Sequence, residues 1–411
     1  MPRGFAKRLS VVVPSVTLAV NAKATALRGR GVDVFGFGVG EPDFDPPTSV
    51  LDAAKRAIDG GAHKYTAVTG IPALKRAICD DHLRRRGQRA TESNVCVSVG
   101  AKQALFNVAL ALYEPGDEVV IPTPCWVSYP EQVRLAGAEP VFLPAREEDD
   151  WLVSGDALAR VLGPRTKAVI LCTPSNPTGA AYPEARMRDL AAALRESDCW
   201  IIVDEIYAEL VYDGFRHVSI ASVAPDLAAR TVIVDGVSKT YAMTGWRIGW
   251  AIAPPSLVEA LDLVQGQSTS NAATIAQHAA LAALTGPQDT VEAMRGKFER
   301  RRDVMVSGLN SVPGVRCRKP EGAFYAFADC RGLYGIEHDG KTITSDDDVA
   351  FFLLERAHVA AVPGEAFGAP GYVRFSYATS EERIKAGIDS IRRAIASARR
   401  VADPPPASAR P

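Results

Sequence analysis

The sequence has little cysteine, no long apolar run and almost no net charge, and each of these absences excludes a class of protein. Seven cysteines in 411 residues, with no C-x-x-C spacing, form no disulfide framework, and their odd number favours reduced thiols in a cytoplasmic protein. No apolar run approaches the ~18 residues of a membrane-spanning helix. Lys and Arg total 47 against 48 Asp and Glu, so no overall field attracts nucleic acid or an anionic membrane. We expect a soluble globular protein, and its length suggests two or three domains.

The N-terminus imitates a secretion signal. A basic pair precedes the apolar stretch Leu9–Val20, and small residues typical of a cleavage site follow it. Pro14 interrupts the stretch, however. We therefore expect a helix through Leu18–Leu27, capped by Ser15 or Thr17, in a protein that is not exported.

Short runs of β-branched residues alternate with amphipathic segments along most of the chain. This order predicts strands and helices in a mainly parallel α/β sheet covered on both faces. The predicted strands are Val95–Val99, Val119–Ile121, Ala168–Cys172, Trp200–Val203, Thr231–Val234 and Ile248–Ile252, and the predicted helices include Lys102–Tyr113 and Glu184–Arg195. From about Val291 the pattern changes and predicts a smaller α+β lobe. This lobe has helical sequence at Phe298–Asp303 and strands at Gly322–Ala328 and Val373–Ser376.

Informative residues follow the predicted strands, where open parallel sheets bind their ligands. Gly100 opens a helix and is suited to phosphate, although most such turns only connect a strand to a helix. Asn176 lies in a Pro/Gly turn, where it also suits an unusual backbone conformation. Asp204 ends a strand and is equally suited to capping a helix, and Lys239 stands among small residues that would leave it simply exposed. Each residue alone has an ordinary structural explanation.

One cofactor chemistry needs all of these residues together. Pyridoxal phosphate requires a lysine for a Schiff base, a carboxylate for the pyridinium nitrogen and a polar cup for the phosphate. A carboxylate beside the ring nitrogen favours its protonated form. Lysine suits the linkage because burial and neighbouring positive charge lower its pKa.

The sequence resembles a fold-type I pyridoxal-phosphate enzyme, specifically a class I aminotransferase of the bacterial aspartate aminotransferase branch. The resemblance spans about Pro14 to Arg393 and rests on motifs that recur in order. They are Gly40–Phe44, Tyr65-Thr66 with Gly70–Pro72, Gly100–Phe106, Trp126–Pro130, Ser175–Gly179, Asp204–Tyr207, Ser238–Gly249, Gly322–Tyr325 and Val373–Ala378.

The resemblance implies a large domain with a mainly parallel seven-stranded sheet flanked by helices, and a smaller α+β domain. Residues 1–47 would belong to the small domain, 48–290 would form the large cofactor-binding domain, and 291–400 would complete the small domain. Residues 401–411 form a Pro-rich stretch that we expect to be a disordered tail.

The resemblance also implies the roles of individual residues around pyridoxal 5'-phosphate. At the ring, Lys239 would form the Schiff base and shuttle the proton, Asp204 would pair with the ring nitrogen, Asn176 and Tyr207 would bind the phenolic oxygen, and Trp126 would stack on the ring. At the phosphate, the cup would consist of Gly100, Ala101, Lys102, Ser238 and Arg247, joined by Tyr65 from the second subunit of a homodimer. Trp126 and Asn176 would also line the substrate site, where Arg374 and Gly40 would hold the α-carboxylate.

The predicted reaction is ping-pong amino transfer from aspartate or glutamate to 2-oxoglutarate or oxaloacetate. Lys102 occupies the position whose lysine in this branch reaches a distal carboxylate. Val13 stands where many members have a second lysine, so aromatic or other apolar amino acids remain an alternative. A lyase outcome on the same fold also remains open, because the cofactor's chemistry is steered by bond orientation.

Two readings from other classes find little support. A ligand-sensing regulator would need an added DNA-binding domain, and the aminotransferase pattern already begins near residue 14. A nicotinamide dehydrogenase would need a helix after Phe35–Gly40, which the pattern does not provide.

The other unusual residues have structural explanations. The six histidines lack metal-ligand spacing, so we expect no metal, and Cys125 is expected to pack in the core. The basic runs Arg84–Arg86 and Arg300–Arg302 are expected to form solvated helix faces.

Overall fold

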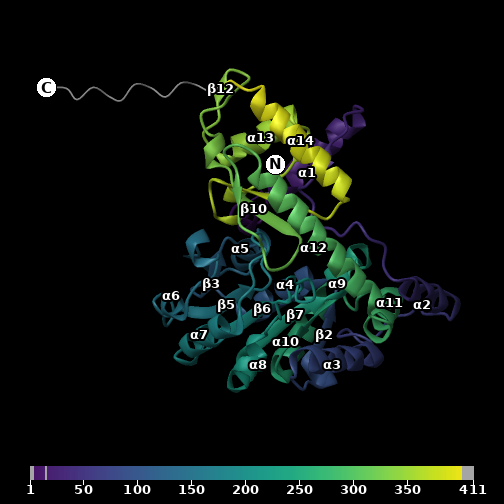
Figure 1. Ribbon diagram of the computed structural model, residues 1–411. Coiled ribbons are helices and arrows are strands. Elements are labelled where there is room, and N and C mark those ends of the chain that lie inside the picture. The colour runs from purple at the N-terminus through teal and green to yellow at the C-terminus, as the bar shows by residue number, and fades with distance from the viewer. Residues whose placement is uncertain (1–3, 14–15, 400–411) are drawn as a thin grey trace. The chain divides into compact units, whose positions relative to one another are not determined.

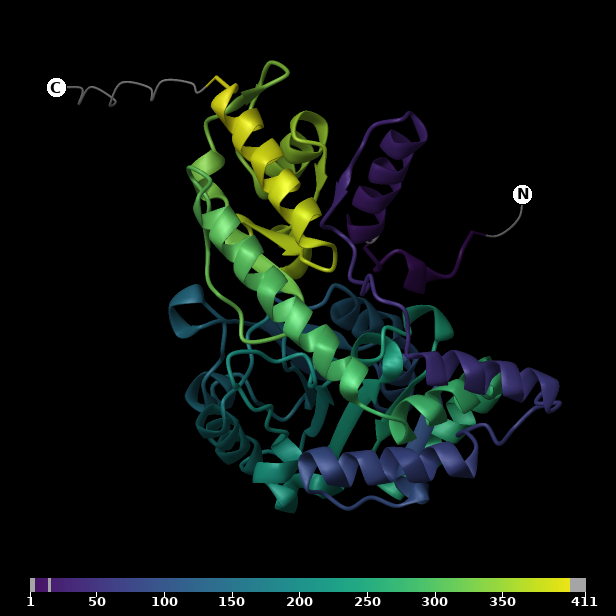
Figure 2. The same cartoon turned by 45° about the vertical axis from the view of Figure 1, so that its right-hand side comes forward.

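The computed structural model describes residues 4–13 and 16–399, which form two compact units (Figures 1 and 2). The first contains residues 4–13, Glu41–Glu299 and 320–323. The second contains residues 16–40, 300–319 and 324–399. The side chains of the expected caps Ser15 and Thr17 and the tail 401–411 lie outside the described residues.

These units divide the chain at other positions than the expected 47/48 and 290/291. The later change of unit falls inside one continuous helix, α12 (Asp289–Asn310), so no loop marks it in the sequence. Residues 4–13 cluster with the first unit, where the Val13 N–H donates to Glu131 Oε2 over 2.8 Å.

The first unit is built around a seven-stranded sheet in the order β2-β8-β7-β6-β5-β3-β4. Its strands are β2 (Val95–Ser98), β3 (Glu118–Thr123), β4 (Glu139–Pro144), β5 (Thr166–Cys172), β6 (Trp200–Asp204), β7 (Thr231–Gly236) and β8 (Gly249–Ile252). Only β8 pairs antiparallel to its neighbours, so the mainly parallel sheet is confirmed. The six strands expected here all exist. The edge strand β4 has no counterpart among them because its burial pattern is mixed.

Helices surround this sheet in Figures 1 and 2. They are α2 (Thr48–Asp59), α3 (Pro72–Arg86), α4 (Ala101–Leu112), α5 (Ser128–Leu135), α6 (Gly155–Ala159), α7 (Glu184–Arg195), α8 (Ile220–Val223), α9 (Val237–Thr240), α10 (Pro255–Ser268) and α11 (Thr274–Thr285). Apolar residues of α4, α5 and α10 pack on the central strands in one buried cluster. Burial of such a cluster, at ~25 cal/mol per Å² of apolar surface, is the main stabilising contribution to this unit.

The second unit combines short sheets with long helices. Its strands are β1 (Phe35–Gly36), β9 (Arg316–Cys317), β10 (Tyr325–Asp329), β11 (Glu337–His338), β12 (Lys341–Thr342), β13 (Val359–Ala360), β14 (Val362–Pro363) and β15 (Tyr372–Ser376), with the antiparallel order β14-β15-β10-β9 in the largest sheet. The helices are α1 (Val16–Gly29), α13 (Asp346–Arg356) and α14 (Glu381–Ala396), besides the end of α12. The Ser345 hydroxyl caps α13 and the Ser380 hydroxyl caps α14, which fixes where each begins.

No helix among residues 4–13 and 16–399 is both long and apolar enough to cross a membrane. The arginine runs correct the sequence-based expectation of solvated helix faces. Arg84 is half exposed, but Arg86 retains 7% of its exposure, Arg301 8% and Arg302 none. Arg86 pairs with Glu205 and Asp235, which lie far along the chain and which local sequence does not reveal, whereas Arg302 pairs with the adjacent Asp303.

Candidate active site

The carboxyl ends of the parallel strands gather most of the expected site residues at one edge of the sheet. Gly100 follows β2, Asn176 follows β5, Asp204 ends β6 and Lys239 follows β7. Arg247 precedes β8, and because β8 runs antiparallel its start lies at this same edge. The topology thus brings together residues that are up to 147 positions apart.

A cradle with the chemistry of an anion site is built from two glycines and an arginine. Gly100 caps α4 with φ +82°, and a Cβ there would come within 2.9 Å of the Arg247 Cζ. A Cβ on Gly249 would come within 2.6 Å of the Gly100 carbonyl carbon. The guanidinium is oriented by a 2.8 Å bond from Nη1 to the Thr244 carbonyl. The start of a 12-residue helix, with its N–H groups and its dipole, therefore lies close against a cation, because the two glycines carry no side chain that would hold them apart.

Asp204 is buried at the end of β6, and two donors meet its carboxylate. The Tyr129 hydroxyl donates to Oδ2 over 2.7 Å and the Ile206 N–H donates to Oδ1 over 3.2 Å. Burial raises the pKa of Asp204 to about 6, against the lowering effects of Tyr129, the Ile206 N–H and the Lys239 charge. A cation placed against this carboxylate would recover the cost of burying its charge.

Lys239 lies on α9, the single helical turn after β7, and its residue is half buried. The turn lies tight against β8, because a Cβ on Gly236 would be 2.9 Å from both the Gly249 Cα and the Ile248 carbonyl oxygen. Ser238, the residue before it, is buried, and so are Asn176 in the segment after β5 and Tyr207 in the segment after β6.

Trp126 and Lys102 lie together next to the cradle. The Lys102 ammonium is 4.9 Å from the centre of the Trp126 ring, within cation–π range. Burial, and then the charge of Arg247, lowers the pKa of Lys102. The Trp126 ring meets the Tyr129 ring edge to face, with centres 5.4 Å apart.

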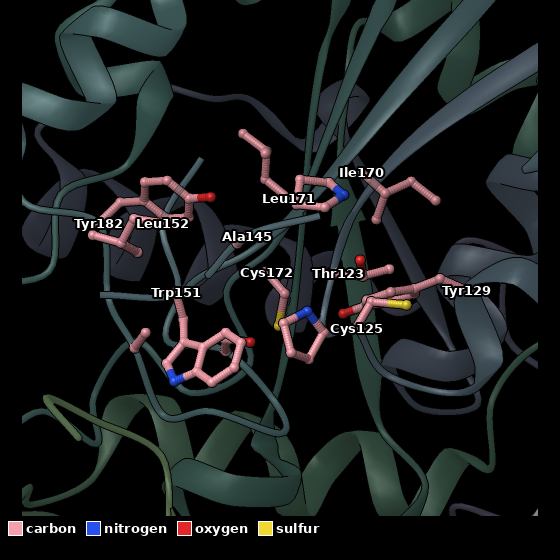
Figure 3. A pocket seen from close by; sticks show the side chains of 14 residues that line it. Thr123, Cys125, Tyr129, Ala145, Trp151, Leu152, Ile170, Leu171, Cys172 and Tyr182 are labelled. Carbon is pink, nitrogen blue, oxygen red and sulfur yellow. The ribbon is translucent and has the colours of Figure 1, made fainter. Parts of the chain in front are cut away.

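A small cavity of about 20 Å³ lies behind Tyr129, with room for one water molecule. Figure 3 shows Tyr129 and Cys125 at one side of this cavity, with Tyr182 and Trp151 at the other. The cavity is too small for a cofactor. It matters here because two buried tyrosines line it from opposite sides, and of these Tyr129 donates to Asp204 whereas Tyr182 accepts from the Val153 N–H.

Three further expected residues are carried by other segments of the chain. Tyr65 is on the loop after α2 and keeps 89% of its exposure. Arg374 and Gly40 belong to the second unit. There the buried Arg374 guanidinium donates to the Gly38 carbonyl over 2.8 Å and lies 4.5 Å from the ring centre of Tyr325. The Tyr325 hydroxyl also leaves no room for a side chain on Gly40, so Arg374 and Gly40 both lie against Tyr325.

Tyr129 and the arginines that end α3 are the contributors that sequence reasoning did not identify. Tyr129 lies within the Trp126–Pro130 motif, yet its partner Asp204 is 75 residues away and no local pattern reveals the contact. Arg85 and Arg86 bind segments adjoining Asp204 and Lys239. Sequence reasoning had interpreted this run of arginines as a solvated helix face.

Comparison with known proteins gives consistent matches over the whole fold. The family model for aminotransferases of class I and II matches residues 32–391. The aspartate/prephenate aminotransferase of Cereibacter sphaeroides is 48% identical over 379 residues, covering 92% of this chain and 95% of the relative. The aspartate aminotransferase of Rhizobium meliloti is 46% identical over 388 residues, covering 94% and 95%.

Solved structures agree. The crystal structure of an aspartate aminotransferase from Rhizobium meliloti has a TM-score of 0.93 at 44% identity, covering 97% of this chain and all of that one. The aspartate aminotransferase of Thermus thermophilus with maleate has a TM-score of 0.90 at 41% identity, covering 96% of this chain and all of that one.

Proposed function

The chain belongs to the class I and II aminotransferase family, and we propose that it transfers the amino group of aspartate or glutamate to a 2-oxo acid with pyridoxal 5'-phosphate as cofactor. The observation that carries the proposal is the meeting of Lys239, Asp204 and the Gly100–Arg247 cradle at one sheet edge. An amine, a buried carboxylate and an anion site are the three groups that this cofactor requires.

The residues present fit the cofactor. The cradle between the start of α4 and the Arg247 guanidinium suits a phosphate, and Asp204 suits a protonated ring nitrogen, because a cation there offsets the burial of its carboxylate. Trp126 offers a ring face, and Asn176 and Tyr207 offer polar atoms for the phenolic oxygen. When bound, the cofactor supplies an electron sink for the substrate's α-carbon.

The chain's own residues supply positioning and proton transfer. Lys239 would hold the cofactor through its Nζ and, once released by the incoming amine, would be the base that takes the substrate's α-proton and the acid that gives a proton back. Asp204, which accepts from the Tyr129 hydroxyl, would offer its charged carboxylate to the ring nitrogen of the cofactor. Arg374 binds the substrate α-carboxylate through its two-pronged guanidinium, beside the backbone of Gly40.

Acidic substrates are favoured by the charge next to Trp126. Lys102 is a cation over the Trp126 ring, suited to a second carboxylate on the substrate. The Thermus thermophilus relative was solved with maleate, which has two carboxylates. Two relatives are named for aspartate, and one of these also for prephenate. We further place the enzyme in the cytoplasm, since all seven cysteines are free thiols.

We propose a homodimer with shared sites, and the exposure of Tyr65 supports it. Its side chain is exposed, but its loop is anchored, because the Thr274 hydroxyl donates to the Lys64 carbonyl over 2.8 Å and Gln277 donates to the Thr66 hydroxyl over 3.1 Å. An exposed tyrosine on an anchored loop suits a role at a neighbouring subunit's phosphate. Mixing inactive Lys239→Ala subunits with impaired Tyr65→Ala subunits should restore activity in hybrids. Full activity in a strictly monomeric species would refute the shared site.

The central test is covalent labelling. Borohydride reduction of the holoenzyme should fix the cofactor to the peptide that contains Lys239, and Lys239→Ala should bind it without that bond and lose nearly all turnover. Recovery of the label on Lys102 would refute the assignment. Equal amounts of new amino acid and keto acid separate a transaminase from a lyase, which would release ammonia or carbon dioxide instead.

A further inference from the structure

Helix α3 ends in three consecutive arginines, Arg84–Arg86, whose environments differ. The Arg84 side chain is 51% exposed and pairs with Asp81 on its own helix. The Arg85 side chain is 12% exposed and that of Arg86 is 3% exposed. Gly87 then ends the helix in a left-handed conformation, with φ +69°. The last two arginines therefore point into the first unit and need partners there.

Arg86 joins two segments that carry site residues. Its Nε donates to Glu205 Oε2 and its Nη2 donates to Asp235 Oδ2 over 2.8 Å. Glu205 directly follows Asp204 in the chain, and Asp235 lies four residues before Lys239. One guanidinium thus spans the ends of β6 and β7.

Arg85 joins the same two segments further along. Its Nη1 pairs with Glu209 Oε1 over 2.9 Å, and its Nη2 donates to the Tyr241 hydroxyl over 2.9 Å. Glu209 lies two residues after Tyr207, and Tyr241 lies two residues after Lys239. The two arginines therefore bridge segments 205–209 and 235–241 at both ends.

We propose that Arg85 and Arg86 form an arginine clamp: positioning residues that hold the segment of Asp204 and Tyr207 in register with the segment of Lys239. The inference rests on the proposed function, since it assigns the clamp to the geometry of that same site. Neither arginine touches the candidate reacting groups; each acts through the carboxylate or hydroxyl that it binds.

The chemistry of the clamp favours positioning over simple stabilisation. A buried ion pair costs about as much in lost hydration as it returns in attraction, so replacing it by apolar side chains is often neutral or stabilising. The planar guanidinium, in contrast, fixes the direction of two hydrogen bonds at once, which an ammonium does not. Site geometry is sensitive to such control, because a displacement of ~1 Å can lower a rate about 100-fold.

The test uses the holoenzyme of Arg85→Met, Arg86→Lys and the control Arg84→Met, which alters the same run at its exposed position. For the two clamp variants we expect kcat to fall about tenfold or more while KM for the amino donor changes less than about threefold. We also expect the pH midpoint of the cofactor's visible absorption change, which reports on the linkage to Lys239, to shift. Arg84→Met should match the wild type in all three measurements.

A milder variant keeps the proposal testable if a buried replacement fails to fold. Tyr241→Phe removes only the hydroxyl that accepts from Arg85, and should shift the absorption midpoint in the same direction as Arg85→Met. The clamp is refuted if the folded variants lose melting temperature alone, with kcat and the absorption midpoint equal to those of Arg84→Met. Failure of the proposed function looks different, because the wild type itself would then give no absorption change with amino donors.

Discussion

Replacing Tyr129 by phenylalanine tests how the site controls the charge of Asp204. Tyr129→Phe removes one hydroxyl oxygen and keeps the ring against Trp126. The lost bond is the 2.7 Å donation to Asp204 Oδ2. Burial raises the pKa of Asp204 to about 6, and Tyr129 opposes that rise. Without the hydroxyl, the charged form of Asp204 loses support and its pKa rises further.

The size of the effect follows from the charge on the acceptor. A hydrogen bond to a charged group is worth ~1.5–3 kcal/mol, and each pKa unit corresponds to ~1.4 kcal/mol. The pKa of Asp204 should therefore rise by about one to two units. If the cofactor binds to ionised Asp204, its affinity depends on the ionised fraction of the free protein. Near pH 6 this fraction should fall about 5- to 50-fold in the variant, and near pH 9 both proteins are ionised and the difference vanishes.

The assay is the dissociation constant of pyridoxal 5'-phosphate, measured from about pH 6 to pH 9 in a Lys239→Ala background so that binding is reversible. The ratio of variant to wild type should grow as the pH falls. Tyr182→Phe is the matched control, since Tyr182 lines the same cavity but accepts from the Val153 N–H and does not contact Asp204. A ratio that is constant across this range would refute the reasoning, because it would mean that the hydroxyl does not act through the charge of Asp204.

Three further predictions follow from the same edge of the sheet. Gly100→Ala should weaken cofactor binding about 10- to 100-fold in a binding titration, because a residue with a side chain is strained at φ +82° and the added Cβ would crowd Arg247. The control Gly163→Ala should leave binding unchanged, because the space around Gly163 is open. Lys102→Ala should lower kcat/KM for aspartate and glutamate about tenfold or more and leave phenylalanine within about twofold; an equal loss for all donors would remove its assignment to the distal carboxylate. Asp204→Asn should abolish turnover, yet it should stabilise the apoprotein against urea by up to about 3 kcal/mol above pH 6. The pKa of Asp204 is raised from 3.8 to about 6 in the folded protein, so the stability of the wild type falls as the pH rises through that window. A stability difference between variant and wild type that does not depend on pH would contradict this.

The chain itself determined much of this protein, because the informative signals are local. Ten residues of sequence are enough to recognise a strand of β-branched residues followed by Asp204, or a strand followed by a turn of small residues and Lys239. The parallel pairing of the strands then brings their carboxyl ends to one edge of the sheet. Helix α7 was predicted with its observed bounds, Glu184–Arg195, for the same reason.

Only the tertiary structure decided which polar groups control those residues. Tyr129 and Asp204 are 75 residues apart, and Arg86 lies 119 residues from Glu205 and 149 from Asp235. A run of three arginines has the same local sequence pattern whether it faces water or carboxylates. The carboxylates that offset the cost of burying an arginine come from distant segments, so they are known only once the chain is packed. The sequence also did not reveal that the two units divide inside the continuous helix α12. The hydrophobic periodicity of a helix shows which of its faces is buried, but not which unit that face packs against.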